Sequence, residues 1–335
     1  MDPDQVGDPD GERRPIGPLD PAIVPRYAGP STFARLPTAQ QVGSRADIAV
    51  LGIPFDSGTS YRPGARFGPA AVRQASRALR TAYHPPHDLE PFARLQVVDA
   101  GDIPANPFSI DEALDQIEGG YAELLVNSST VVAIGGDHTV TLSALRALHR
   151  QFGPLSLVHF DAHLDTWDTY FGAPYTHGTF LRRASEEGLF VDDGSMHVGI
   201  RGPLYDRDDL ARDASFGFRV VHCDEFQRHG VDEVIERIRD RIGDRPLYVS
   251  VDIDVLDPAH APGTGTPEVG GMTTRELLNV LRGLAGSRVI GADVVEVSPP
   301  YDHAELTSLA AATVAYELLA LGVLDKTAGA EAEAG

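Results

Sequence analysis

The sequence is poor in cysteine: Cys223 is the single cysteine among 335 residues. An intrachain disulfide needs two cysteines and a thiolate zinc site needs more, so the composition excludes both. The composition fits a reducing compartment, and we expect a cytoplasmic protein. We interpret Cys223 as a small apolar side chain in the core.

The chain also lacks an export signal and a long apolar run. The N-terminal stretch MDPDQVGDPDGERRPIGPLDP is acidic and rich in Pro and Gly, without the basic start and apolar segment of a signal peptide. We find no continuous run of about 18 apolar residues, the length that a membrane span requires. We therefore expect no membrane partner.

Basic residues are few, with 28 Lys and Arg against 49 Asp and Glu, which gives a formal net charge of −21. This charge repels a phosphate backbone and excludes nucleic acid as a partner. It would attract a cationic substrate, although the same charge also suits a solubilising surface or a high-salt host.

Short apolar stretches rich in Val and Ile alternate with helix-like stretches along the chain. The apolar stretches cover 47–53, 95–101, 130–136, 155–161, 196–200, 218–224, 247–255 and 288–297. Strands that are apolar on both faces and alternate with helices indicate a parallel sheet with helices on both sides. The pattern fits either a closed barrel or an open three-layer sheet, and both place active sites at the carboxyl ends of the strands.

No internal repeat or linker divides the chain, so we predict one domain. We expect a flexible N-terminal arm over 1–30, a single catalytic domain over 31–325 and a disordered tail over 326–335, where the sequence becomes low in complexity.

The stretch LVHFDAHLDTW, residues 157–167, ends an apolar strand with three potential metal ligands. Asp161, His163 and Asp165 occupy alternate positions, and alternate side chains of an extended strand share a face. Crowding these groups together without partners would be costly, and a bound cation would remove that cost.

Two other strand ends add ligands of the same kind. SVDIDVLDP places Asp252 and Asp254 two residues apart, and VVAIGGDHTV ends in Asp137 and His138. We expect Asp137 to cap the next helix or support a ligand. The remaining four carboxylates and two imidazoles, with no sulfur, suit Mn²⁺ and also Co²⁺, Ni²⁺ or Zn²⁺. Six ligands indicate two ions.

These motifs resemble those of a known family. GGDH, DAHLD and SVDIDVLDP are similar to the three metal-binding motifs of the ureohydrolases, the family of arginase and agmatinase. YRPGARFGPAAVR (61–73), THGT (176–179) and EVSPPYD (296–302) extend the similarity over roughly 30–322. The resemblance implies an α/β fold, a three-layer α/β/α sandwich with a mainly parallel eight-stranded sheet, which removes the barrel alternative. It also implies two Mn²⁺ per subunit and a homo-oligomer, a trimer or hexamer.

The resemblance also assigns roles to residues. One ion would take His138, Asp161, Asp165 and Asp254, and the other would take His163, Asp161, Asp252 and Asp254. The implied reaction is hydrolysis of a guanidinium group to urea and an amine. In it Asp165 would also contact the attacking water, His177 would protonate the leaving amine, and Glu296 would pair with the guanidinium. His177 and Glu296 would therefore both touch the substrate.

The substrate is predicted to be a small guanidino compound. EVSPPYD and YTHGTFLRR resemble agmatinase-like members, and DTWDTYFGAPYTHGT lacks the pattern with which arginases bind an α-amino acid. We therefore expect conversion of agmatine to putrescine and urea.

Two alternatives stay open. One is a guanidino-acid hydrolase similar to guanidinobutyrase, guanidinopropionase or proclavaminate amidinohydrolase, in which Arg201, Arg207 or Tyr170 would bind a tail carboxylate. The other is a catalytically silent metal-binding relative, which the presence of His177 and Glu296 disfavours. Trp167, Tyr170 and Tyr175 would line the tail pocket or pack their loop.

Overall fold

Eight parallel strands form one sheet in the part of the chain that the computed structural model describes, residues 14–43 and 46–334. The strands are β1 Ile48–Gly52, β2 Val97–Asp102, β3 Thr130–Ile134, β4 Ser156–Phe160, β5 Ser195–Ile200, β6 Phe218–His222, β7 Leu247–Asp252 and β8 Val289–Val295. Their order is β2-β1-β3-β8-β7-β4-β5-β6, and every neighbouring pair is parallel. The sheet is open, so the predicted sandwich is confirmed.

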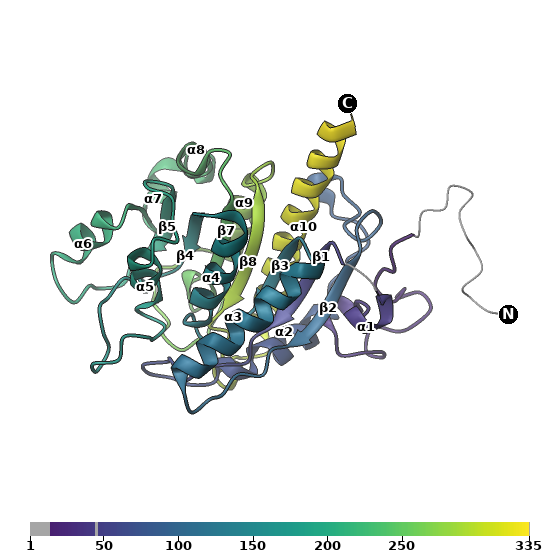
Figure 1. The fold of residues 1–335 in the computed structure, drawn as a ribbon, viewed down its shortest axis with the longest axis horizontal. Coiled ribbons are helices and arrows are strands. Elements are labelled where there is room, and N and C mark those ends of the chain that lie inside the picture. The colour runs from purple at the N-terminus through teal and green to yellow at the C-terminus, as the bar shows by residue number, and fades with distance from the viewer. Residues whose placement is uncertain (1–13, 44–45, 335) are drawn as a thin grey trace.

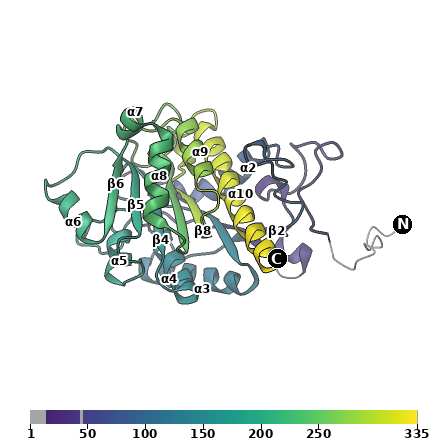
Figure 2. The same ribbon diagram turned by 90° about the horizontal axis from the view of Figure 1, so that it is seen from above.

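Helices cover both faces of the sheet (Figures 1 and 2). One layer holds α2 Gly68–Ser76, α8 Val231–Ile242, α9 Thr274–Gly283 and α10 Leu306–Ala334, and the other holds α3 Ile110–Asn127, α4 Val140–Phe152 and α5 Phe180–Glu186. The short helices α1 Ala39–Val42, α6 Asp209–Ser215 and α7 Glu225–His229 lie at the ends of the sheet. Each predicted strand is present because its stretch is apolar on both faces.

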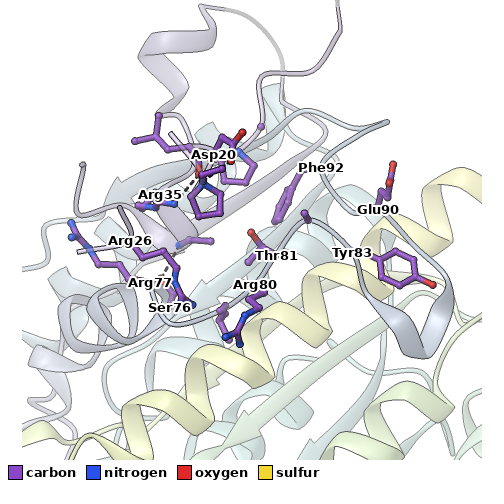
Figure 3. Close-up of a pocket in the computed structure, with 18 of the residues that line it drawn as sticks. Asp20, Arg26, Arg35, Ser76, Arg77, Arg80, Thr81, Tyr83, Glu90 and Phe92 are labelled. Carbon is purple, nitrogen blue, oxygen red and sulfur yellow. Dashed lines mark hydrogen bonds between the residues drawn. The ribbon is translucent and has the colours of Figure 1, made fainter. Parts of the chain in front are cut away.

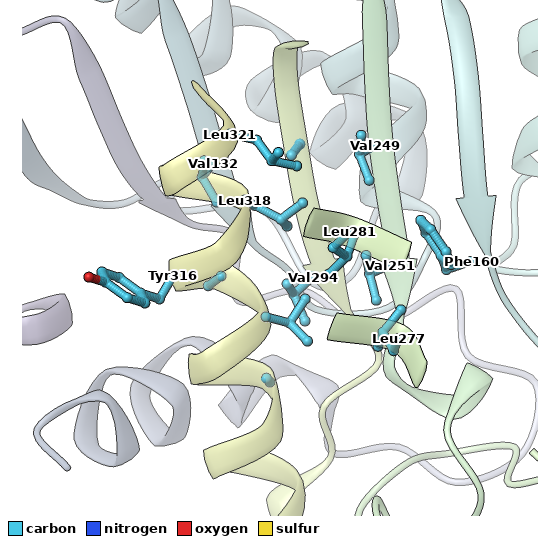
Figure 4. Packing of buried hydrophobic residues seen from close by; sticks show 14 of the residues in the cluster. Val132, Phe160, Val249, Val251, Leu277, Leu281, Val294, Tyr316, Leu318 and Leu321 are labelled. Carbon is cyan, nitrogen blue, oxygen red and sulfur yellow. The ribbon is translucent and has the colours of Figure 1, made fainter. Parts of the chain in front are cut away.

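Two apolar cores form, one on each side of the sheet. Figure 4 shows the first, where Val249 and Val251 of β7 and Val294 of β8 meet Leu277 of α9 and Leu318 of α10. Full burial of each such side chain contributes about 1.5–3 kcal/mol. Cys223 is only half-buried and packs against this core.

Helix α10 is apolar and runs through the expected tail. Its segment Leu306–Thr327 has a mean hydropathy of 1.6 and is long and apolar enough to cross a membrane, although Glu317 and several polar residues interrupt it, so it holds no continuous run of 18 apolar residues. The protein itself buries 83% of that window, which makes it a core helix. The tail expected to be disordered instead continues α10 as far as Ala334, and its alanines and glutamates favour a helix.

The N-terminal segment 14–30 is attached to the domain, although a flexible arm was expected over 1–30. The Arg35 guanidinium donates to the carbonyls of Leu19 and Val24, each at 2.8 Å, and the Ile16 amide donates to the Gln96 side chain at 2.9 Å. Residues 1–13 of the expected arm lie outside the described residues. Hydrogen bonds to backbone carbonyls hold this segment, and its amino-acid composition does not predict such bonds.

The strand order brings the sequence motifs together. The last two strands, β7 and β8, insert between β3 and β4, so these four strands are neighbours in the middle of the sheet. Carboxyl ends of parallel strands meet at one edge, and all three predicted metal motifs and EVSPPYD follow or end these strands. At this edge Gly136 passes so close to Phe55 that a Cβ atom would overlap the Phe55 carbonyl.

We predict that Gly136→Ala lowers the free energy of unfolding by at least about 1–3 kcal/mol, because the clash is with backbone that has little freedom to move. Gly119→Ala, in α3 with open space around its Cα, should instead raise it by about 0.5–1 kcal/mol. Urea unfolding of both variants measures the difference. Equal effects in the two variants would contradict this account of the close approach.

Candidate active site

The motif side chains converge at the carboxyl ends of the central strands. His138 follows β3, Asp161 follows β4, Asp252 ends β7 and Glu296 follows β8. All four are buried, with at most 3% of their surface exposed. Residues separated by more than a hundred positions thereby form one cluster.

The side chains of the DAHLD motif converge because the chain turns after β4, and not because alternate residues of a strand share a face. Strand β4 ends before Asp161, and Asp165 has a left-handed backbone with φ of 56°. The Asp161 Oδ1 atom accepts the His163 amide at 2.6 Å, and Asp252 Oδ1 accepts the Asp254 amide at 2.8 Å. The two motifs thus use the same carboxylate-to-amide turn, which corrects the expectation of extended, same-face side chains.

The first group of potential ligands surrounds the His138 imidazole. Its Nδ1 atom lies 3.2 Å from one Oδ2 atom each of Asp161, Asp165 and Asp252. Among the described residues, neither His138 Nδ1 nor Asp161 Oδ2 has a satisfactory hydrogen bond, although both are buried. Such unsatisfied buried atoms are costly unless something binds them.

The second group surrounds His163 and shares Asp161 with the first. The His163 Nδ1 atom lies 3.3 Å from Asp161 Oδ1 and 3.2 Å from Asp254 Oδ2. Donor atoms of His138, His159, Asp161 and Asp165 lie within 4.8 Å of one another, and so do those of Asp161, His163 and Asp254. The six residues predicted as metal ligands therefore form two adjoining groups.

The tautomer of His138 is fixed from behind. The Ser250 hydroxyl donates to Asp293 at 2.7 Å, so it accepts the Nε2–H of His138 at 2.8 Å. This leaves the Nδ1 lone pair facing the carboxylates, which is the arrangement that usually supports a metal-bound imidazole. Ser250 and Asp293 stand in otherwise apolar strands, and the sequence alone gave no sign of this role.

The charges in the cluster are poorly balanced by the protein. Burial and the charge of Asp161 raise the pKa of Asp165 to about 6, and burial with neighbouring carboxylates raises the pKa of Asp252 and Asp254 as well. Burial alone would lower the pKa of His138 and His163, but the surrounding carboxylates raise it well above its usual value. Bound protons partly take the place of a cation here. The donor set fits a pair of divalent ions.

The His177 imidazole lies beside this cluster with a partner on each ring nitrogen. Its Nδ1 atom lies 2.9 Å from Glu296 Oε1, and its Nε2 atom lies 3.1 Å from the Ser60 amide and 2.7 Å from the Ser60 hydroxyl. The amide donates to a neutral ring, whereas the hydroxyl accepts from a protonated ring. Ser60, which the sequence analysis did not select, thus supports both protonation states.

Glu296 lies behind His177 and has one buried carboxylate oxygen without a partner among the described residues. Its Oε1 atom accepts the His138 amide and faces His177, each at 2.9 Å, while Oε2 is buried without a partner among the described residues. The residue has φ of 63°, an uncommon and strained value for a glutamate. Strain of this kind concentrates at functional sites.

Asp137 stabilises the loop beside the cluster, while the N-cap position of α4 is Thr139. The Asp137 carboxylate accepts the Thr139 amide at 3.0 Å, next to the start of α4, and the Gly58 amide at 2.7 Å. These bonds connect the segment that carries Ser60 to the one that carries His138.

A pocket of about 500 Å³ opens over the cluster. Its wall includes His163, Asp165, Asp252 and His177, but not Glu296, which lies behind His177. A larger cavity of about 930 Å³ lies elsewhere, between the N-terminal segment and residues 76–93, and contains none of the predicted site residues (Figure 3). The smaller pocket is therefore the candidate active site.

The outer wall of the pocket agrees only partly with expectation. Trp167 and Tyr170 line it, but Tyr175 packs against the core instead. Two charged residues that the sequence analysis did not assign to substrate, Arg62 and Glu268, line it as well. Arg62 lies over the rings of Tyr61 and Tyr301, with its guanidinium carbon 5.4 and 5.3 Å from their centroids.

The two arginines considered for a tail carboxylate do not reach the pocket. The Arg201 guanidinium donates to backbone carbonyls, including those of Asp254 at 2.6 Å and Glu268 at 2.7 Å. Arg207 is exposed and is not part of the pocket wall. Arg201 is therefore a structural residue that holds the loops after β7.

The open sandwich and the paired His/Asp groups at its strand ends define a metal-dependent hydrolase. The chain belongs to the arginase family, whose sequence model matches residues 46–321. It is 47% identical to the guanidinopropionase of Pseudomonas aeruginosa, over 91% of this chain and 95% of that protein. It is 42% identical to the agmatinase of Photorhabdus laumondii, over 86% of this chain and 92% of that protein. The crystal structure of proclavaminate amidinohydrolase from Streptomyces clavuligerus superposes with a TM-score of 0.85 at 44% identity, covering 90% of this chain and 99% of that one.

We predict that Asp252→Ala and Asp254→Ala each lose at least one equivalent of bound metal, because each removes a carboxylate from the cluster. Asp257→Ala is the matched control from the same motif, since the Asp257 side chain accepts the Gly270 amide outside the cluster. Elemental analysis after Mn²⁺ loading and desalting gives the stoichiometry. Two retained ions in both cluster variants would refute this ligand assignment.

Proposed function

We propose that the protein hydrolyses agmatine to putrescine and urea. The observation that carries this proposal is the pair of His/Asp groups at the floor of a pocket whose wall holds His177, itself bonded to Glu296. A pocket of this size suits a small linear substrate, and the ligand chemistry suits hydrolysis.

We assign the metal site to His138, Asp161, His163, Asp165, Asp252 and Asp254. Oxygen and nitrogen donors without sulfur favour Mn²⁺, while Co²⁺, Ni²⁺ and Zn²⁺ share this preference in part. Two such ions would supply an activated water at neutral pH, which the resonance-stabilised guanidinium carbon requires.

Residues of the protein would supply the proton that the leaving amine needs. Burial alone would lower the pKa of His177, but the charge of Glu296 and the hydrogen bond to it raise the pKa to about 9. The ring is then protonated at neutral pH and able to give a proton to the departing amine. After the transfer, the Ser60 amide stabilises the neutral ring by donating to Nε2.

Glu296 would orient the guanidinium group. Its Oε2 atom is a buried acceptor without a partner among the described residues, and a carboxylate facing a planar guanidinium fixes direction as well as charge. Such orientation accounts for a large part of the barrier reduction in reactions of this kind.

The tail of the substrate would meet two opposite charges. Glu268 lies on the wall with one oxygen 3.9 Å from His163, and its hydrogen bond to His163 lowers its pKa, so it is ionised and suits the ammonium of agmatine. Arg62 on the same wall supports the second candidate, a guanidino acid with a tail carboxylate. The carboxylate-rich surroundings and the formal charge of −21 favour the cationic tail.

We also propose that the enzyme works as a cytoplasmic homo-oligomer, a trimer or hexamer. Several large apolar side chains are almost fully exposed in the single chain, including Phe171 at 98% and Phe108 at 96%. Exposed apolar groups of this kind are typical of surfaces that other subunits cover. Sedimentation of the purified protein measures the assembly.

The substrate assignment predicts urea release from Mn²⁺-loaded enzyme with agmatine, at a higher kcat/KM than with guanidinobutyrate, guanidinopropionate or arginine. Arg62→Gln should leave agmatine turnover equal or faster and slow guanidinobutyrate further, since it removes the positive charge from the wall. If guanidinobutyrate is the better substrate and Arg62→Gln abolishes that preference, the guanidino-acid candidate replaces agmatine. No urea from any of these compounds would favour the silent relative.

The acid assignment predicts that His177→Ala keeps both metal ions but loses roughly 10²–10⁴-fold in kcat, the usual contribution of a general acid. Ser60→Ala should have a smaller effect, because it removes the hydroxyl but keeps the amide that donates to Nε2. Urea release at neutral pH measures both. A His177→Ala enzyme with near wild-type turnover would exclude this role.

A further inference from the structure

A chain of buried polar side chains runs from Asp161 away from the pocket. Asp161 Oδ2 lies 2.9 Å from His159 Nε2, His159 Nδ1 lies 2.8 Å from His197 Nδ1, and His197 Nε2 lies 3.1 Å from Asp213 Oδ1. None of the four is more than 1% exposed. The Thr166 hydroxyl donates to the same Asp213 oxygen at 2.9 Å.

The contacts along this chain differ in kind. The Nδ1 atoms of His159 and His197 are hydrogen-bonded to each other, one ring donating and the other accepting, and His197 Nε2 is hydrogen-bonded to Asp213. At the other end, His159 Nε2 and Asp161 Oδ2 lie 2.9 Å apart without the alignment of a hydrogen bond. The His159 ring therefore packs directly against the Asp161 carboxylate.

This series of side-chain contacts also connects the two ends of the DAHLD loop. His159 and His197 are register partners on the neighbouring strands β4 and β5, and Asp213 lies on α6. Asp161 at the start of the loop is connected to Asp213 through the two rings, and Thr166 at its end is bonded to Asp213 directly. Both ends of the ligand-bearing loop are thus held by one side chain.

We propose that His159, His197 and Asp213 are positioning residues that hold Asp161 in the orientation needed to serve both metal sites. This inference rests on the proposed binuclear site, in which Asp161 is the carboxylate common to both groups. Hydrogen-bond partners behind metal ligands typically change metal affinity by 10–100-fold. A histidine in an apolar strand gives no sign of its partners in the sequence, so these contacts emerge only from the fold.

The test replaces His197, which does not touch Asp161. His197→Phe keeps a ring against Phe218, whose centroid lies 4.5 Å away, but removes the hydrogen-bond partner of His159 Nδ1. We expect the Mn²⁺ dissociation constant of the metal-free protein, measured by calorimetry, to rise about 10–100-fold. His197→Asn places an amide near the Nδ1 position, so it should recover most of the affinity.

A control away from the cluster is Asp99→Asn. Asp99 is also buried, at 2% exposure, and its carboxylate on β2 pairs with Arg73 at 2.8 Å. Its substitution should cost thermal stability in the metal-free protein but leave Mn²⁺ affinity unchanged. Circular dichroism of all variants confirms that the metal-free fold is retained.

The outcomes separate this inference from the proposed reaction. Wild-type affinity in His197→Phe, an equal loss in Asp99→Asn, or no recovery in His197→Asn would each overturn the positioning role. Wild-type protein that binds two ions and shows the predicted series, yet releases no urea, would reject the reaction and support the positioning role. Wild-type protein that binds no Mn²⁺ would overturn both.

Discussion

The structure depends on one constraint: four buried carboxylates converge at one edge of a parallel sheet with only two imidazoles, those of His138 and His163, in the two groups to balance them. Mutual repulsion and lost hydration make this arrangement unfavourable for the protein alone. The raised pKa of Asp165, Asp252 and Asp254 expresses that cost. Two divalent cations would balance it, so the fold is arranged to be completed by its metals.

This constraint explains the arrangement of the polar groups around the cluster. Ser250 and Asp293 direct the Nδ1 lone pair of His138 into the cluster, and His159, which is hydrogen-bonded to His197, contacts Asp161 from the other side. The chain of hydrogen bonds behind His138 ends on the buried Asp293 carboxylate, so it has a fixed direction. A metal ligand needs a free lone pair, and that direction is what leaves the lone pair free.

The sequence predicted the features that come from locally repeating or alternating residues. It did not predict the contacts between residues that are far apart in the chain. All eight strands and the convergence of the six predicted ligands were accessible, because apolar strands and ligand-rich strand ends are local patterns. The geometry of the DAHLD loop was not, since a left-handed Asp165 breaks the alternation on which the prediction relied. Arg201 was misread for a similar reason: its carbonyl partners are recruited from loops more than fifty residues away.

Substrate choice depends less on local sequence patterns than any other property of the site. The reacting group meets residues whose chemistry is fixed by the reaction, namely the ligands, His177 and Glu296, whereas the tail meets only the outer wall. There Glu268 and Arg62 present opposite charges within one pocket of about 500 Å³. Arg62 is stacked between Tyr61 and Tyr301, which lowers the cost of leaving its charge without a carboxylate. Glu268 faces the His163 imidazole at 3.9 Å, and that imidazole would be neutral as a metal ligand, so an ammonium tail gains more from Glu268 than a carboxylate tail gains from Arg62.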